Sequence, residues 1–180
     1  MQTAPSIVSG KPLSSNARGR AAEVVKFAGH NRAYVAELLR KAESLAARVP
    51  ADRRMFYQAH VVTPIRIHLH SLEMLESYGK SLVAYSAGDK PQCITLAEKS
   101  LRAADDLFAA LHQAEYGKWS RWFIGERFVG LEASRDRLRM LLAALRGQPP
   151  PPTRRRLDYE DLYEYQEPFL KNFPLLHPKK

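Results

Sequence analysis

The sequence predicts an all-α protein, an antiparallel three- to four-helix bundle with a flexible N-terminal arm and a C-terminal tail joined through prolines. Several long stretches repeat apolar residues at spacings of three and four, which is typical of helices that bury one face. Short turns containing Gly and Pro separate these stretches, as expected for antiparallel neighbours. A chain of 180 residues, 45% apolar and 26% charged, is sufficient for one globular domain.

We expect four parts along the chain. Residues 1–16 form a flexible arm, because they combine Pro, Gly and five Ser or Thr residues without an apolar period. Residues 17–147 form the helical bundle. Residues 148–156 form a stiff Pro/Arg linker, and residues 157–180 form an acidic-aromatic docking tail.

The first helical pattern runs from about Ala17 to Val49, and Pro50 stops it. Residues spaced by three and four predict one buried stripe, made of Val35, Leu38, Ala42, Leu45 and Val49. Gly29 can divide this stretch into two helices, and Asn31 can cap the second one.

The second pattern starts near Asp52 and continues to about Ala87, with Pro64 inside it. Because proline removes a backbone donor, we expect a bend there. Apolar residues occupy two faces, with Ile65, Leu69 and Leu72 on one and Ile67, Met74 and Tyr78 on the other. So wide an apolar surface indicates the central helix of the bundle. Residues 62–70 also alternate polar and apolar like a strand, but the length of the pattern favours a helix.

The third helix shows the clearest period in the chain. Gly88 and Asp89 form the turn before it, and Pro91 suits its first turn. Its predicted buried residues are Ile94, Ala97, Leu101, Ala104, Phe108 and Leu111. We expect it to end at Tyr116, with Gly117 in the left-handed conformation.

The fourth helix is predicted from about Leu131 to Arg146, with Gly147 after it. Its inward residues are Leu138, Leu141, Leu142 and Leu145. The prolines that follow exclude a longer helix, and residues 157–170 can form a short amphipathic helix beyond them.

The chain is basic, with a formal net charge of +9 and an isoelectric point near 9.8. The positive excess lies in the N-terminal quarter and around the fourth helix, and three short Arg clusters stand out: Arg18 and Arg20, Arg53 and Arg54, and Arg154, Arg155 and Arg156. Such a balance fits either a solvated Arg-rich surface or contact with a polyanion.

The segment between the third and fourth helices, 114–131, is the most unusual one. It interleaves aromatic and charged residues, and its candidate contact residues are Tyr116, Lys118, Trp119, Arg121, Trp122, Phe123, Glu126 and Arg127. Flat aromatic rings beside charged groups can stack on a sugar, a nucleobase or a partner's side chain. The alternative is that both Trp residues plug the end of the bundle, with a cation stacked on them.

The docking tail is the second candidate contact region. Residues 157–170 contain five acidic residues and no basic one, and aromatic residues continue to Phe173. The spacing of Tyr159, Leu162 and Tyr163 favours docking, either back onto the basic bundle or onto a neighbouring domain.

No catalytic motif is present. The chain has no P-loop, no G-x-G-x-x-G, no H-E-x-x-H and no G-x-S-x-G, and its one Cys excludes an internal disulfide and a Cys-rich zinc site. A weaker hypothesis is an enzyme site in the bundle core around His60, His68 and Glu73, although ordinary interior or surface histidines are preferred. We therefore expect no catalytic residue, no metal and no cofactor.

The chain shows no features of membrane targeting. Its N-terminus lacks the charged start and apolar stretch of a secretory signal, and no apolar run is long enough for a membrane helix. We expect a soluble protein, cytoplasmic by default, without a membrane partner.

Three features together resemble a known group of proteins. They are F-Y-x-x-H-V-V-T-P-I at Phe56–Ile65, the G-D-K turn at Gly88, and E-Y-G-K-W-x-x-W-F-x-G-E-R at 115–127. This combination resembles the helical regions near the C-termini of large bacterial glycoside hydrolases that act on plant polysaccharides. The resemblance covers about residues 30–146. It implies a helical accessory module, or a fragment of a longer enzyme, in which Trp119, Trp122 and Arg127 face the catalytic domain or the glycan.

The leading functional hypothesis is a noncatalytic helical accessory or interaction module that binds a partner protein domain or a glycan, as part of a carbohydrate-active enzyme. The alternative is a basic helical domain that binds nucleic acid through the three Arg clusters.

Overall fold

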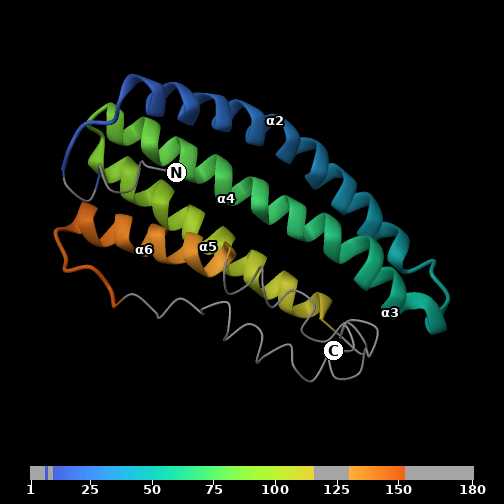
Figure 1. Cartoon of the computed structure of the whole chain (residues 1–180). Helices are drawn as coiled ribbons and strands as arrows, with labels where there is room; N and C mark the ends of the chain where they lie inside the picture. Colours follow the sequence, from blue (N-terminus) through green and yellow to red (C-terminus); the bar gives the residue numbers. More distant parts are fainter. Residues whose placement is uncertain (1–6, 8–9, 116–129, 153–180) are drawn as a thin grey trace, which may run out of the picture.

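The computed structural model describes residue 7, residues 10–115 and residues 130–152 of the 180-residue chain. This part of the chain contains no strand, and the predicted all-α bundle is confirmed (Figure 1). Its four long helices are α2 (Ser15–Ala46), α4 (Thr63–Ser86), α5 (Lys90–Ala114) and α6 (Glu132–Arg146).

The connection between α2 and α4 is made of short, irregular helical turns. A 3-10 turn, η1 (Ala51–Arg53), leads into α3 (Arg54–Tyr57) and then into a π-helical turn, η2 (Gln58–Val62). Pro64 lies in the first turn of α4, directly after η2. The irregularity at this place is a π turn directly before Pro64, and the bend expected there stays a prediction.

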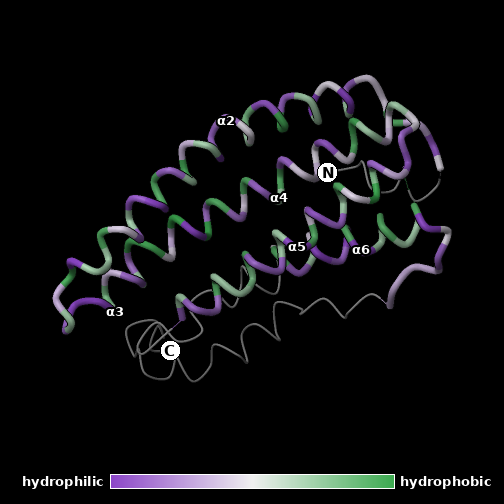
Figure 2. The backbone as a smooth tube through the Cα atoms, turned by 180° about the vertical axis from the view of Figure 1, so that it is seen from behind, coloured by the Kyte–Doolittle hydropathy of each residue, from purple (hydrophilic) through white to green (hydrophobic). Residues whose placement is uncertain are grey.

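The helices form a row in which α4 lies between α2 and α5, and α6 packs on α5 (Figures 1 and 2). Hydrophilic and hydrophobic stretches alternate along α2 and α4, as expected for helices with an apolar side (Figure 2).

Both predicted apolar faces of α4 are buried or partly buried against neighbours. The face with Ile65, Leu69 and Leu72 packs against α2, and the face with Ile67, Met74 and Tyr78 packs against α5 and α6. The interpretation of α4 as the central helix is confirmed.

The contact between α2 and α4 depends on small residues. The buried line on α2 consists of residues seven apart, Ala21, Ala28, Val35 and Ala42. Opposite this line, a Cβ atom on Gly79 would lie 2.9 Å from Cγ2 of Val25 and 3.2 Å from the carbonyl oxygen of Ala21. The two backbones therefore approach more closely at Gly79 than any other residue would allow without a shift.

Two expectations for the first helix are wrong. The helix is not divided at Gly29 but continues through it, and the Asn31 side-chain amide donates to the carbonyl oxygen of Phe27 instead of capping a second helix. Leu38 and Leu45 are not in the buried stripe but are 39% and 45% exposed. The reason is that α4 packs on the neighbouring line of mostly small residues, Ala21, Ala28, Val35 and Ala42, because small side chains allow α2 and α4 to approach each other more closely.

The segment before α2 packs on the bundle at its described positions. Ile7 and Leu13 are buried in the cluster that contains Leu82 and Leu145, and the Tyr85 hydroxyl donates to the carbonyl oxygen of Lys11 over 3.2 Å. A flexible arm was expected over residues 1–16. At the described positions this segment is instead anchored on the bundle, because the side chains of Ile7 and Leu13 are buried. The Ser14 side chain caps α2 by accepting from the Ala17 amide.

The turn residues predicted around α5 are confirmed. Gly88 has a positive φ of 77°, and the Asp89 side chain caps α5 by accepting from the Gln92 amide over 3.0 Å. The helix ends at Ala114, two residues before the expected position.

The limits of α6 also agree with the prediction. It ends at Arg146, and Gly147 after it has a φ of 67° in the left-handed region. The four leucines expected to face inward, Leu138, Leu141, Leu142 and Leu145, are all buried.

Gly79 and Gly19 provide a matched test of the close contact between α2 and α4, because both are helical but only Gly79 lies at that contact. We expect Gly79→Ala to lower the free energy of unfolding by about 1–2 kcal/mol, because the added methyl group meets the Ala21 backbone, which cannot move freely. Gly19→Ala, at a helical position with no atom within 4 Å, should instead raise it by about 0.5–1 kcal/mol. Urea denaturation followed by circular dichroism measures both, and equal effects of the two substitutions would contradict the close contact.

Candidate functional site

The predicted contact residues between α5 and α6 lie outside the described part of the chain. This applies to all eight of them, Tyr116, Lys118, Trp119, Arg121, Trp122, Phe123, Glu126 and Arg127. The docking tail over 157–180 and the cluster Arg154–Arg156 also lie outside it.

Arg135 holds the first turn of α6 against α5. Its guanidinium lies 2.6 Å from the Asp105 carboxylate and 3.1 Å from that of Glu132, and it stacks over the Phe108 ring at 4.6 Å from the centroid. The largely buried guanidinium of Arg135 thus links α5 and α6, the two helices that flank residues 116–129 in the sequence.

A second charged cluster joins α2 to α4. Glu76 is 8% exposed and lies 2.5 Å from Arg32 and 2.6 Å from Lys80. Burial raises the pKa of the Glu76 carboxyl, but its hydrogen bonds to Lys80 and Arg32 outweigh this, and the pKa lies below its ordinary value. Gly29 makes room for the carboxylate, because a Cβ there would lie 3.4 Å from Oε1 of Glu76. This cluster fixes the register of α2 on α4 rather than presenting a reactive group.

The histidine hypothesis is wrong for the bundle core. His60 and His68 are exposed, and Glu73 lies 3.0 Å from Nδ1 of His70, its neighbour on α4. His60 stacks on Phe56 with 4.3 Å between ring centroids. Among the described residues no group of three or more His, Cys, Asp and Glu is placed to hold a metal ion.

A small groove opens between α4, α5 and α6. It has a volume of about 70 Å³ and is lined mainly by apolar side chains, including Met74, Tyr78 and Leu138. Pockets that hold drug-sized ligands are several times larger, roughly 300–1,000 Å³. The groove therefore has room for a few atoms of a ligand at most.

Two of the basic clusters lie at opposite ends of α2. Arg18 and Arg20 are in its first turns, whereas Arg53 and Arg54 follow its last residue. A helix of 32 residues is about 48 Å long, at about 1.5 Å per residue. The two pairs therefore do not form a single patch.

Among the described residues, four of the seven large apolar side chains that are exposed lie on α2. We call these four the α2 stripe, and they are Phe27, Tyr34, Leu38 and Leu45, which are 62%, 69%, 39% and 45% exposed. These residues follow one another at intervals of seven, four and seven, which places them on one side of the helix.

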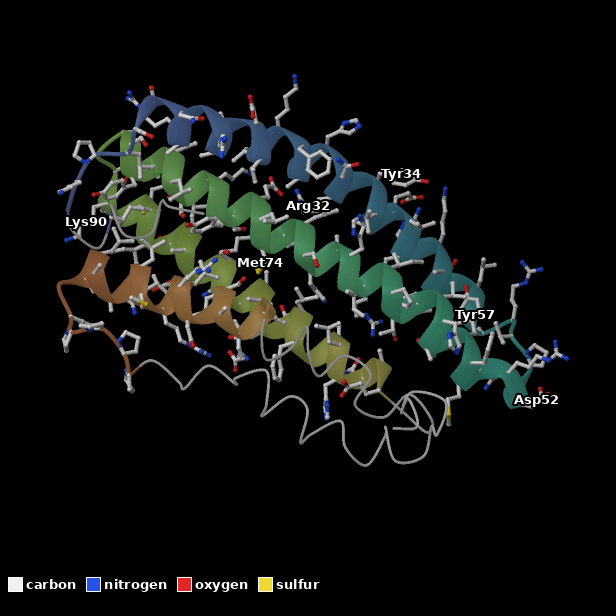
Figure 3. All side chains as sticks on the ribbon, in the orientation of Figure 1. Arg32, Tyr34, Asp52, Tyr57, Met74 and Lys90 are labelled. Carbon is white, nitrogen blue, oxygen red and sulfur yellow. The ribbon has the colours of Figure 1, made fainter. Side chains whose placement is uncertain are left out.

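The α2 stripe lies on a different side of the helix from the buried line. Successive residues on a helix are about 100° apart, so Tyr34 is turned by that angle from its buried neighbour Val35. Figure 3 shows Tyr34 on the outer side of α2 and Arg32 on the side that faces α4. The helix thus carries two apolar lines, of which α4 covers one.

Polar residues interrupt and extend the α2 stripe in the pattern of a coiled-coil seam. Asn31 stands between Phe27 and Tyr34, and Lys41 stands between Leu38 and Leu45. Arg20 continues the line one seven-residue step before Phe27. A row of large apolar residues with isolated polar ones is the pattern by which a helix selects a partner helix.

The sequence contains the spacing that defines the α2 stripe, but the predicted buried stripe combines residues of the exposed line and of the buried line. Apolar residues of the first helix cover an arc wider than one neighbour can bury, and Leu38 and Leu45 were assigned to the buried side. Phe27 and Tyr34 are spaced from them by heptad intervals, and this spacing could have separated the two lines.

Comparison of the chain with protein-family models, with curated proteins and with solved structures finds no match. No helix among the described residues has both the length and the apolar character needed to cross a bilayer.

The Glu76 cluster predicts a specific pH dependence. Because the pKa of Glu76 is lowered from 4.5 in the folded chain, its ionised form stabilises the fold above that value, and this contribution is lost as the pH falls through the folded pKa. We expect Glu76→Gln to lower the free energy of unfolding by about 1–3 kcal/mol at neutral pH. Urea denaturation between pH 7 and acid should show this difference shrinking below pH 4.5.

Glu37→Gln is the matched control, because Glu37 also pairs with two cations but does so on the exposed surface of α2. Its unfolding midpoint at pH 7 should stay close to that of the unchanged chain. Equal losses in the two variants would contradict the role of the buried cluster.

Proposed function

We propose that this chain is a noncatalytic helical interaction module that binds a partner protein through the α2 stripe. The observation that carries the proposal is the row of four large, exposed apolar side chains on one helix. Single exposed apolar residues are common on soluble proteins, whereas an aligned row of them marks an interaction surface.

The spacing of the α2 stripe supports a helix as the binding element of the partner. Intervals of seven and four place Phe27, Tyr34 and Leu38 where side chains of a second helix can insert between them. The α2 helix carries six Lys or Arg residues and three Glu, so a partner helix with acidic flanks fits it best.

A more specific proposal is that the partner is a domain of a carbohydrate-active enzyme. The support is the resemblance of residues 56–65 and 115–127 to helical regions of bacterial glycoside hydrolases. Trp119, Trp122, Phe123 and Arg127 would then form a contact loop that faces the catalytic domain or the glycan. The nucleic-acid alternative has weaker support, because the described Arg pairs lie at opposite ends of α2, with about 39 Å of helix between Arg20 and Ala46.

The partner surface can be tested with a defined probe. We expect a synthetic acidic amphipathic helix, with Leu at heptad positions and Glu beside them, to shift the NMR signals of α2 amides between Phe27 and Leu45. Binding should be weak, with a dissociation constant on the order of a millimolar or somewhat below, which NMR titration detects. The double variant Tyr34→Ser, Leu38→Ser should lose the shifts, because it removes the centre of the α2 stripe.

Val83→Ser is the matched control, since Val83 is 44% exposed but lies on α4. It should leave the shifts unchanged, and all these variants should keep their unfolding midpoints, because they alter exposed side chains. A peptide that causes no shift in α2, even in a chain whose acidic residues 157–170 are neutralised, would overturn the proposal. The nucleic-acid alternative would be favoured if a DNA duplex instead shifted the NMR signals of Arg18, Arg20, Arg53 and Arg54 and lost this effect as the salt concentration is raised.

The proposed contact with a glycan can be tested separately by Trp fluorescence, because both Trp residues of the chain lie in the segment 116–129. We expect a soluble xylan-type oligosaccharide to change the Trp fluorescence equally at low and high salt, since stacking on a neutral sugar involves no counterion release. Trp122→Ala should abolish the change. Silent fluorescence would exclude glycan contact by the two Trp residues and leave the α2 stripe proposal standing.

A further inference from the structure

We propose that the occupant of the α2 stripe within this chain is its own acidic segment, residues 157–170, which competes there with the partner helix. This inference rests on the proposed function, because it concerns the same surface. It adds an internal ligand and therefore a regulation of partner binding.

Charge complementarity is the first argument. Residues 157–170 contain Asp158, Glu160, Asp161, Glu164 and Glu167 and no basic residue. On α2, Arg20 and Lys41 lie on the line of the α2 stripe itself, and Lys41 also lies 3.5 Å from Glu37 on the same helix. Lys26 lies on the same helix and makes no ion pair within the described part of the chain. An acidic segment laid along α2 thus meets cations before and within the apolar row.

The second argument is reach. Leu145, near the end of α6, and Ala21, near the start of α2, belong to one buried cluster, so α6 ends at the end of the bundle where α2 begins. The ten residues 147–156 can span at most about 33 Å at about 3.3 Å per residue. Phe27 lies only six residues along α2 from Ala21, about 9 Å at the helical rise.

The third argument is the match of length and pattern. The α2 stripe from Phe27 to Leu45 is about 27 Å long, and a helix over residues 157–170 would be about 21 Å long. Tyr159, Leu162 and Tyr163 recur at helical spacing among the acidic residues. Such a helix would place its apolar side on the α2 stripe and its carboxylates toward the cations of α2.

A second copy of the chain fits the α2 stripe less well. Each α2 helix carries six Lys or Arg residues and three Glu, so two of them face to face would bring together helices of net positive charge, and like charges oppose association. The acidic segment carries the opposite charge and is already tethered nearby, at an effective concentration on the order of a millimolar.

A spin label on the tail tests the placement in the full chain. Tyr163→Cys introduces one reactive thiol, because Cys93 is fully buried and burial raises the pKa of its thiol to about 11. With a nitroxide on this thiol, we expect the amide signals of Phe27–Leu45 to broaden at least threefold more than those on the outer side of α5. The broadening should persist when chains that carry both the spin label and ¹⁵N are diluted with chains that carry neither, because the contact lies within one chain.

Two sets of variants decide whether the contact is the proposed one. Neutralising the tail with Asp158→Asn, Glu160→Gln, Asp161→Asn, Glu164→Gln and Glu167→Gln should remove the broadening, as should Tyr34→Ser with Leu38→Ser. Val83→Ser on α4 should leave it unchanged. Broadening elsewhere, uniform broadening, or broadening of unlabelled ¹⁵N chains mixed with spin-labelled ones would overturn the internal contact.

The same variants separate this inference from the proposed function. If the tail covers the α2 stripe, the acidic peptide should bind the tail-neutralised chain about fivefold or more tightly than the unchanged chain, because a tethered competitor has been removed. Equal affinities would overturn the inference while the partner surface stands. If the peptide fails to bind even the tail-neutralised chain, the proposed function fails instead.

Discussion

The structure depends on one constraint, which is that α4 is apolar on two faces and must be covered on both. The face with Leu69 and Leu72 requires α2, and the face with Met74 and Tyr78 requires α5 with α6 behind it. At the edge of the bundle one of these two wide faces would remain in water, so the central position is the one that buries both. The row of helices in Figure 1 follows from this requirement, and among the described helices it leaves α2 at the edge, packed mainly on α4.

The position of α2 at the edge explains both its small residues and its exposed large ones. Burial against α4 uses Ala21, Ala28 and Ala42, whose short side chains allow the backbones to approach at Gly79. Glu76 then holds the register by pairing with Arg32 across the contact. The large side chains that a closed bundle would bury, Tyr34 among them, lie instead on the side that no described helix covers (Figure 3).

Much of this arrangement could be predicted from the sequence, and the rest could not for identifiable reasons. The two faces of α4, the turn at Gly88 and Asp89 and the end of α6 before Gly147 follow from local periodicity and turn chemistry, which a sequence displays directly. The exposure of Leu38 was missed, because helical spacing shows how wide an apolar arc is but not which part of it meets a neighbour. Arg32, the partner of Glu76 on the other helix, is 44 residues away, a distance at which a local pattern carries no signal.

The energy available from the α2 stripe bears on what kind of partner can use it. Its four side chains are already about half buried, so covering them fully would contribute about 3–6 kcal/mol, at about 1.5–3 kcal/mol for each complete burial. Association of two free molecules costs an estimated 4–15 kcal/mol in lost translational and rotational freedom, which offsets most of this gain and leaves a free partner only weak affinity. Tethering removes most of that cost. The stripe is therefore suited to an occupant held nearby by the same chain or the same assembly, and this is the feature that an acidic tail and an adjoining enzyme domain share.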